Sequence, residues 1–233
     1  MPVIVVANPK GGVGKTTLST NIAGYYASRG HAVMLGDVDR QQSARTWLAL
    51  RPAELAPIGA WEVTHDQIVR PPKGTTHVVL DTPAGLHGKR LDEVMKLADK
   101  VLIPLQPSIF DIHATHEFVQ KLLAGKRRGI PSLPDPLGRR PPPQSGDRGS
   151  SSTKRSERVQ IAIVGMRTRE GTISTDQLRG FLEGLGAPLL GFLRDTQNYV
   201  HLAAHGLTLW DVGSSRFERD HAQWEPVTRW LDA

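Results

Sequence analysis

Residues Lys10–Thr17 read Lys-Gly-Gly-Val-Gly-Lys-Thr-Thr, and this stretch decides the fold class. Glycine accepts backbone conformations that a Cβ forbids, so the three glycines let successive N–H groups point into one concavity. A helix that begins near Lys15 adds the positive end of its dipole to this anion site. The apolar run before it, Val3–Ala7, is typical of a strand buried on both faces of a parallel sheet. The stretch therefore predicts a strand, a phosphate-binding loop and a helix in succession.

The loop departs from the ordinary phosphate-loop pattern, Gly-x-x-x-x-Gly-Lys-[Ser/Thr], at one informative place. The first glycine of the pattern falls at position 9, where the chain has Pro9, and a second lysine, Lys10, follows it. Lys15 is expected to reach the β- and γ-phosphates of a nucleotide, and the hydroxyl of Thr16 to ligate Mg²⁺. Lys10 has no evident task in its own site, because Lys15 already serves there.

Strand and helix signals alternate along the rest of the chain. Apolar runs predict strands over Val3–Asn8, Val33–Asp39, Val78–Asp81, Val101–Leu105, Gln160–Gly165 and Leu189–Leu193. Helices are predicted over Lys15–Ser28, Gln42–Leu50, Leu91–Ala98, Ile112–Leu123 and Asp176–Leu185, the last with a Ser174–Gln177 capping box. The pattern indicates an α/β fold: a doubly wound, mostly parallel sheet flanked by helices. Ligands of such sheets bind beyond the carboxyl ends of the strands, where Asn8, Asp39, Asp81 and Gln106 fall.

Four segments together resemble the ParA/MinD family of P-loop ATPases with a deviant Walker A loop. The first is Pro9–Thr17. The others are Asp37-Val38-Asp39-Arg40-Gln41 (with Arg40 where the family usually has proline), the Walker B-like His77–Gly85, and the strand and turn Val101–Ser108. The resemblance covers nearly the whole chain, except about 30 residues after Lys126.

The resemblance implies ATP and Mg²⁺ as cofactors and a slow ATPase stimulated by a partner. It implies catalytic roles for Lys10, Lys15 and Asp39, with Asp39 activating the attacking water. The implied metal-site residues are Thr16, Asp37 and Asp81; a structural salt bridge is the alternative for Asp37, and a helix-capping or turn aspartate for Asp81. The implied nucleotide contacts are Lys10, Gly11, Gly12, Val13, Gly14, Lys15, Thr16 and Thr17, and, beside the adenine, Met166 and Arg167.

In this family the signature lysine crosses a dimer interface to the partner's nucleotide, which implies a homodimer in the ATP state. A cation supplied in trans stabilises charge on the transferring phosphoryl oxygens, as an arginine finger does. Hydrolysis then removes the bridging anion and loosens the dimer. The alternative for Lys10 is an exposed, solvated lysine.

The composition limits the class of protein and locates its charge. The chain of 233 residues has no cysteine, which excludes disulfides and a cysteine-held iron–sulfur cluster. Nine basic and three acidic residues lie between Lys126 and Arg158, so this segment carries the whole formal charge of +6. It also holds six of the 17 prolines. We expect one ATPase domain over residues 1–233, interrupted by a disordered basic insertion at about 131–157.

DNA contacts are expected at two places. The resemblance places them near His201 and at Arg216 or Arg219, but residues 194–233 hold four basic and six acidic residues, so a solvated surface of mixed charge is the alternative. The insertion offers further cations, because non-specific binding needs only positive charge near phosphates. A tolerated loop without a role is the alternative there; the candidate contacts are Arg139, Arg140, Lys154 and Arg155.

The expected function is that of a DNA-binding ATPase that segregates or positions a plasmid, a chromosome region or a protein assembly. Its expected partners are a second copy, nucleoid DNA and a cargo adaptor or ParB-like stimulator. The alternative is a MinD- or MipZ-like regulator of division-site placement. The last residues, 224–233, contain Pro226 and few cations and make a poor membrane anchor. With no room for a signal peptide before the first strand, we expect a cytoplasmic, nucleoid-associated protein without a membrane partner.

Overall fold

The computed structural model describes residues 1–63, 70–127, 159–182, 184–213 and 215–233. Seven parallel strands form one sheet in the order β3-β2-β4-β1-β5-β6-β7. The strands are β1 (Val3–Val6), β2 (Val33–Asp37), β3 (Ile58–Trp61), β4 (His77–Asp81), β5 (Lys100–Leu105), β6 (Gln160–Thr168) and β7 (Leu189–Arg194). The predicted doubly wound α/β fold is confirmed, and the sheet is parallel throughout.

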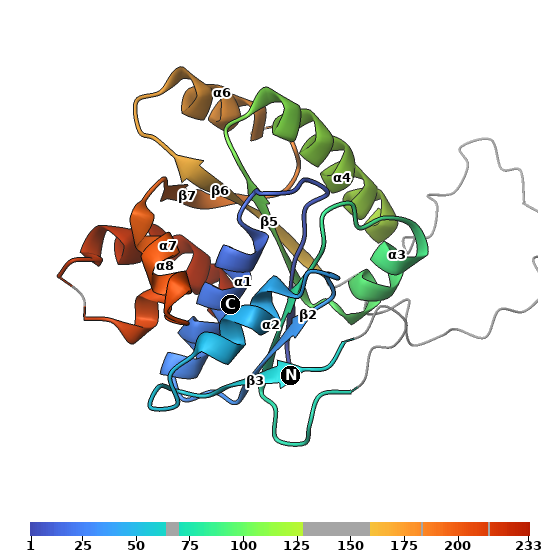
Figure 1. Ribbon diagram of the computed structural model, residues 1–233. Helices are drawn as coiled ribbons and strands as arrows, with labels where there is room; N and C mark the ends of the chain where they lie inside the picture. The colour runs from blue at the N-terminus through green and yellow to red at the C-terminus, as the bar shows by residue number, and fades with distance from the viewer. Residues whose placement is uncertain (64–69, 128–158, 183, 214) are drawn as a thin grey trace, which may run out of the picture.

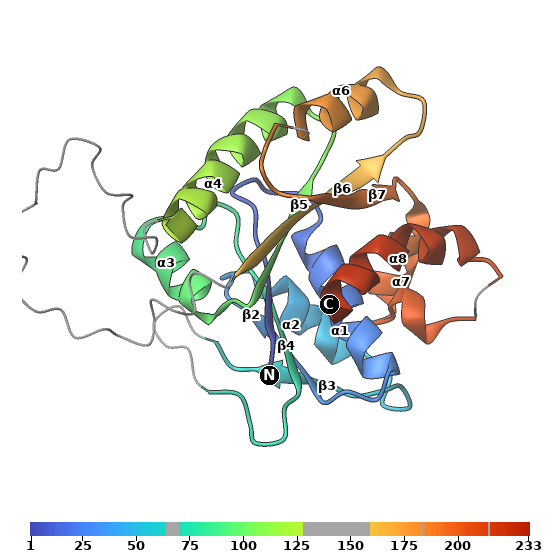
Figure 2. The same ribbon diagram turned by 180° about the vertical axis from the view of Figure 1, so that it is seen from behind.

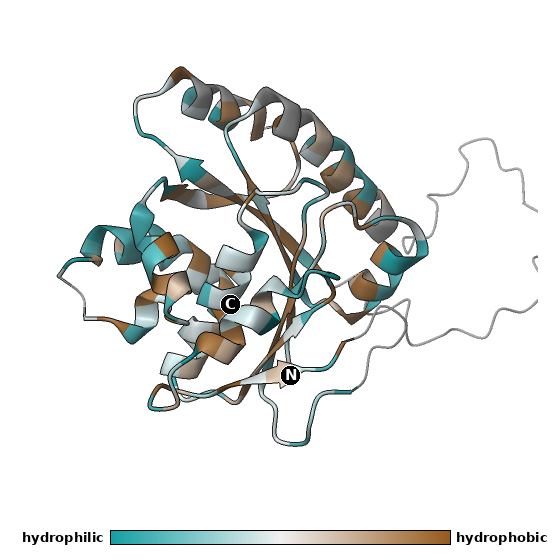
Figure 3. Ribbon diagram, in the orientation of Figure 1, coloured by the Kyte–Doolittle hydropathy of each residue, from teal (hydrophilic) through white to brown (hydrophobic). Residues whose placement is uncertain are grey.

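Helices cover both faces of the sheet (Figures 1 and 2). One face carries α3 (Gly88–Leu97), α4 (Ile109–Arg127) and α6 (Ile173–Leu182). The other carries α1 (Lys15–Ser28), α2 (Ser43–Leu50), α7 (Gln197–Ala204) and α8 (Glu218–Asp232), with the short 3₁₀ helix η1 (Leu209–Asp211). The central strands are hydrophobic along their length (Figure 3).

The strand β1 shows why the central strands read as continuous apolar runs. Its side chains alternate between two cores: Val3 and Val5 pack under α3 and α4, whereas Ile4 and Val6 pack under α1 and the C-terminal helices. All four are buried. A strand covered on both faces needs apolar residues at every position, and this confirms the interpretation of the first residues of the sequence.

The structure adds one strand that was not predicted and contradicts one prediction about a helix start. The edge strand β3 was not predicted, because its four residues, Ile-Gly-Ala-Trp, include a glycine and no apolar alternation. The capping box was also misplaced: α6 begins at Ile173, so Ser174 lies inside the helix. Thr172 precedes the helix, and its carbonyl accepts from the backbone of Thr175 and Asp176.

Three aromatic rings cluster where β4 begins. The ring of His77 lies 4.1 Å from that of Tyr26 on α1 and 4.2 Å from that of His31. Burial, followed by the neighbouring His31, lowers the pKa of His77 to about 4. The folded protein therefore holds a neutral imidazole there over a range of pH in which the unfolded chain takes up a proton.

This difference predicts a pH dependence of stability. Between pH 6.5 and pH 4 the unfolded state binds a proton at His77 that the folded state does not, so stability is lost as the pH falls through this window. We expect His77→Gln to lose less stability than the wild type between pH 7.5 and pH 5, measured by urea unfolding. His201→Gln, on an exposed position of α7, controls for removal of a histidine. Equal losses in all three proteins would contradict the prediction.

Candidate nucleotide site

The phosphate loop lies between β1 and α1, at the carboxyl end of β1 (Figure 1). Gly12 and Gly14 have φ angles of +73° and +95°, which L side chains rarely adopt. Gly11 and Gly12 are exposed, whereas Val13 between the glycines is 1% exposed and anchors the loop in the protein. The predicted order of strand, glycine loop and helix is therefore present, with the open part of the loop facing outward.

The two lysines of the loop are placed differently. Lys15 is 8% exposed, and its ammonium donates to the carbonyl of Lys10 at 2.7 Å. Burial lowers the pKa of Lys15, opposed by the nearby charges of Asp81 and Asp39. Lys10 is partly exposed, and within the described ranges its ammonium has no hydrogen bond or ion pair. Lys15 thus serves its own loop, while the charge of Lys10 is unpaired within the part of the chain that the structure describes.

Asp81 ends β4 and lies directly beneath α1. Its carboxylate is 2% exposed and accepts from the hydroxyls of Thr16 at 2.6 Å and Ser19 at 3.1 Å. Burial raises the pKa of Asp81 to about 7, and the hydrogen bond from Thr16 opposes that shift. Asp81 and Thr16, two of the predicted metal-site residues, are therefore in direct contact.

Asp37 ends β2 beside Asp81, and Asp39 follows two residues after the strand. Asp37 is in register with Asp81 and holds the following backbone: its two oxygens accept from the N–H groups of Asp39 at 2.9 Å and of Ala44 at 2.8 Å. Burial raises the pKa of Asp37. Asp39 is partly exposed and accepts from the N–H of Gln41 at 3.0 Å. In this arrangement Asp37 orients the segment that carries Asp39, and its part in metal binding stays a prediction.

The chemistry of the donor set fits Mg²⁺. Carboxylate and hydroxyl oxygens from Asp81, Asp37 and Thr16 meet at one edge of the sheet, and oxygens are the ligands that Mg²⁺ prefers. Within the described residues no group of three or more His, Cys, Asp or Glu side chains could hold a metal ion. Mg²⁺ would therefore complete its shell with phosphate oxygens and water, as is usual for nucleotide-bound magnesium.

Met166 and Arg167 lie at the end of β6. Met166 is 3% exposed and packs on the loop: a Cβ built on Gly14 would lie 2.8 Å from its Cε. Arg167 is exposed and has a φ of +51°, next to an irregularity in the pairing of β6 with β7. The structure brings Met166 to the loop; contacts of either residue with adenine stay a prediction.

Hydrogen bonds from residues outside Lys10–Thr17 also hold the loop. The amide of Gln106 donates to the carbonyl of Gly12 at 2.8 Å, and the N–H of Gly85 donates to the carbonyl of Pro9 at 2.8 Å. Asn8, 1% exposed, accepts from the N–H of Lys10 at 2.8 Å. The sequence indicated Asn8 and Gln106 only as polar residues that follow apolar strands.

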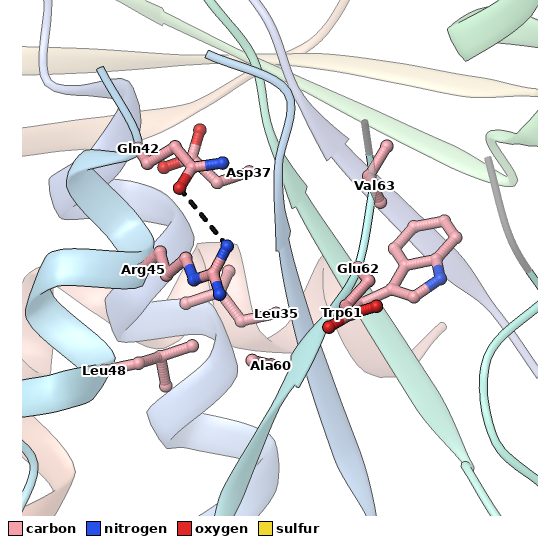
Figure 4. Close-up of a pocket in the computed structure, with 9 residues that line it drawn as sticks. All are labelled: Leu35, Asp37, Gln42, Arg45, Leu48, Ala60, Trp61, Glu62 and Val63. Atoms are coloured by element: carbon pink, nitrogen blue, oxygen red, sulfur yellow. Dashed lines mark hydrogen bonds between the residues drawn. The ribbon is translucent and has the colours of Figure 1, made fainter. Parts of the chain in front are cut away.

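A pocket of about 280 Å³ lies beside Asp37, between α2 and the edge of the sheet (Figure 4). Leu35, Leu48 and Ala60 form apolar walls, and Arg45 reaches toward Gln42, with a hydrogen bond of 3.4 Å. Asp37 is the one predicted site residue that lines it. The pocket therefore adjoins Asp37, and no residue of the phosphate loop lines it.

Three of the predicted DNA contacts lie in the C-terminal part of the chain. His201 is exposed on α7; Arg216 lies 5.6 Å from the ring of Phe217, and Arg219 pairs with Glu170 at 2.9 Å. One of the two arginines is thus already paired with an acid. The four candidates in the insertion lie outside the described residues: Arg139, Arg140, Lys154 and Arg155.

Two curated relatives have the same recorded role. The chain is 36% identical over 121 residues to "Maintenance of carboxysome distribution protein A" of Gloeobacter kilaueensis, which is 51% of this chain and 56% of that protein. It is 26% identical over 217 residues to the protein of the same name from Halothiobacillus neapolitanus, 91% of this chain and 88% of that protein. The first alignment thus spans little more than half of the relative.

Solved structures show the same fold. MinD cell division protein of Aquifex aeolicus superposes with a TM-score of 0.68 at 18% identity, over 100% of this chain and 98% of that chain. The ATP complex of McdA from Cyanothece superposes with a TM-score of 0.65 at 13% identity, over 98% and 96%.

The geometry of Gly14 generates a test of the phosphate loop. An alanine there must adopt a positive φ, so we expect Gly14→Ala to weaken ATP binding by at least tenfold, measured by titration with a fluorescent ATP analogue. The double variant with Met166→Ala removes the steric contact but not the backbone strain, and it should not recover binding.

Gly30→Ala is the matched control, because Gly30 also has a positive φ, +81°, but lies beyond the far end of α1 with open space around it. It should lose stability and keep its affinity for ATP. Full recovery by the double variant would show that the contact with Met166, and not the loop conformation, determines binding.

The family described as "CobQ/CobB/MinD/ParA nucleotide binding domain" matches residues 4–209, which contain the whole loop and every acid described above. The match covers well over half of the chain. Together with the fold and the geometry of the loop, it shows that this protein belongs to the CobQ/CobB/MinD/ParA family of nucleotide-binding domains.

Proposed function

We propose that the protein is an ATPase that dimerises in its ATP state and uses this switch to position a cargo. One observation carries the proposal: a phosphate loop that already has Lys15 presents a second lysine, Lys10, whose ammonium has no partner within the described ranges. A partly exposed free cation beside a phosphate site is suited to an anion that arrives from outside the chain. The nucleotide of a second copy supplies such an anion.

The residues of the site have the properties that phosphoryl transfer requires. Mg-ATP supplies the transferable phosphoryl group and the charge that neutralises it. Lys15 and the loop N–H groups would hold the phosphates, and Thr16 with Asp81 would hold the magnesium. Asp39, partly exposed at the mouth, orients water for attack and accepts its proton. Fixed groups that stabilise the charge developing in the transition state usually make the largest single contribution to the rate enhancement.

Lys10 completes the same chemistry from the partner. Its cation adds to the charge on the phosphoryl oxygens only when two copies face each other, so dimerisation depends on the γ-phosphate. Loss of this phosphate on hydrolysis removes the shared anion and releases the dimer. Intrinsic ATP hydrolysis is slow, and a partner protein accelerates it. The partner therefore determines how long the dimer persists at the cargo.

The relatives suggest what kind of cargo is positioned. Two of them carry the name of a carboxysome distribution protein, so a protein assembly of that kind is the first candidate, and a plasmid or chromosome region is the next. Positioning of this type needs a matrix, for which we propose nucleoid DNA, and an adaptor on the cargo that stimulates hydrolysis.

A membrane matrix, as in the division-site alternative, is less well supported. Within the described ranges no helix has the length and apolar character needed to cross a bilayer. The C-terminal helix α8 uses its apolar side inside the protein, where Trp224, Val227 and Leu231 are buried. An amphipathic anchor needs this face free for lipid.

The proposal predicts opposite effects for two substitutions. With Mg-ATP we expect the wild type to sediment as a dimer, Lys10→Ala to remain a monomer, and Asp39→Ala to accumulate as a dimer because hydrolysis no longer releases it. Analytical ultracentrifugation with ATP and with ADP measures all three. Lys73→Ala, an exposed lysine in the loop that precedes β4, is the control and should behave as the wild type. A Lys10→Ala protein that dimerises normally would refute the role in trans.

A salt titration tests the DNA matrix. Replacement of Arg139, Arg140, Lys154 and Arg155 by Gln should weaken ATP-dependent DNA binding and flatten its dependence on salt. Each lost phosphate contact changes the slope of log affinity against log salt by about 0.9, and all nine cations of the segment set an upper limit of about 8. The comparison variant carries Arg216→Gln and Arg219→Gln. If only this variant loses affinity, the DNA contact lies in the C-terminal part instead.

A further inference from the structure

Asn8 is a buried polar residue at the end of β1, 1% exposed, directly before Pro9 and Lys10. Its amide nitrogen donates to the carbonyl of Pro104 at 2.8 Å and to the hydroxyl of Thr115 at 2.9 Å. Its amide oxygen accepts from the N–H of Lys10 at 2.8 Å. One side chain thus ties the backbone of Lys10 to β5 and to α4, elements 96 and 107 residues further along the chain.

The other polar groups around Lys10 are restrained as well. The carbonyl of Pro9 accepts from the N–H of Gly85 at 2.8 Å, and the carbonyl of Lys10 accepts from the ammonium of Lys15 at 2.7 Å. The backbone of Lys10 is therefore fixed on both sides, whereas its own ammonium has no partner within the described ranges. The restrained backbone therefore preorganises the position from which the Lys10 ammonium extends.

We propose that Asn8 is a positioning residue for Lys10. Only a side chain that donates on one side and accepts on the other satisfies this place: an aspartate could not donate to the carbonyl of Pro104, and a leucine would leave the N–H of Lys10 unpaired. An unpaired buried polar group costs free energy, so the amide keeps the backbone in one conformation. The lysine then meets its anion without first having to be ordered, which lowers the entropic cost of that contact.

The functional part of this inference rests on the proposed role of Lys10 in trans, but the positioning itself does not. Asn21 provides a matched control. It is also a buried asparagine, 5% exposed, and it donates to the carbonyl of Thr17 at 2.9 Å and accepts from the N–H of Leu209 at 3.0 Å. Its loss should cost similar stability but leave Lys10 in place.

The first measurement is amide hydrogen exchange by NMR on the nucleotide-free protein. In Asn8→Ala we expect the N–H of Lys10 to exchange faster by roughly three- to tenfold, the equivalent of one lost hydrogen bond. The N–H groups of Val5 and Ile163, inside the sheet, serve as internal references, and Asn21→Ala should leave the exchange of Lys10 unchanged. Exchange at Lys10 that is the same in Asn8→Ala and the wild type would overturn the inference.

A second variant covers the case in which Asn8→Ala does not fold. Thr115→Val keeps the shape of a fully buried side chain and removes only the hydroxyl that accepts from Asn8. Faster exchange of the Lys10 N–H in this variant supports the inference, and unchanged exchange contradicts it.

The functional measurement is a double-mutant cycle on the dimerisation constant with Mg-ATP, at protein concentrations raised until the weakened association of Lys10→Ala can be measured. If Asn8 acts through Lys10, then Asn8→Ala should add nothing to the loss that Lys10→Ala already causes, whereas Asn21→Ala should add its own effect. Additive losses for Asn8 and Lys10 would contradict action through the lysine.

The two measurements separate the possible failures. A wild type that does not dimerise with ATP would refute the proposed function, while the exchange data would still decide whether Asn8 positions Lys10.

Discussion

The rest of the site depends on the hydrogen bonds that the buried carboxylate of Asp81 accepts from α1. The carboxylate accepts from Thr16 and Ser19 in the first turns of α1, so it joins the end of β4 to the helix that follows the phosphate loop. Because a buried carboxylate is costly without partners, this contact fixes the start of α1 against the sheet. The loop is thereby held at both ends, by β1 and by α1, while Gly11 and Gly12 between them remain exposed.

The helix α1 extends this order to the C-terminal part of the chain. Asn21 accepts from the N–H of Leu209, and its own carbonyl accepts from the indole of Trp210. Further along, Tyr25 donates to Asp232 and Tyr26 to the carbonyl of Leu231. The helix is thus covered by protein along most of its length. The C-terminal part of the chain, where some of the DNA contacts are predicted, is therefore attached to the same helix that begins at the phosphate loop.

Much of the fold could be predicted from the sequence, because the buried strands are continuous apolar runs and the loop has the residue types that its conformation needs. The edge strand β3 escaped prediction because a short, half-covered strand leaves no such pattern. The supporting contacts of the loop could not be predicted for a different reason. Asn8 meets Pro104 and Thr115, and Gln106 meets Gly12, across about a hundred residues, and only the folded chain brings them together.

The central claim, that each nucleotide is served by a lysine from the other copy, is tested most directly by mixing two inactive variants. Lys10→Ala keeps its own Asp39, and Asp39→Ala keeps its own Lys10, so a mixed dimer has one complete site if the lysine acts in trans. After equal amounts are mixed before ATP is added, ATP hydrolysis should rise clearly above that of either variant alone, up to a limit of roughly one quarter of the wild-type rate, which random pairing in a symmetric dimer would give. A mixture that stays as inactive as its two components would show that Lys10 acts within its own chain.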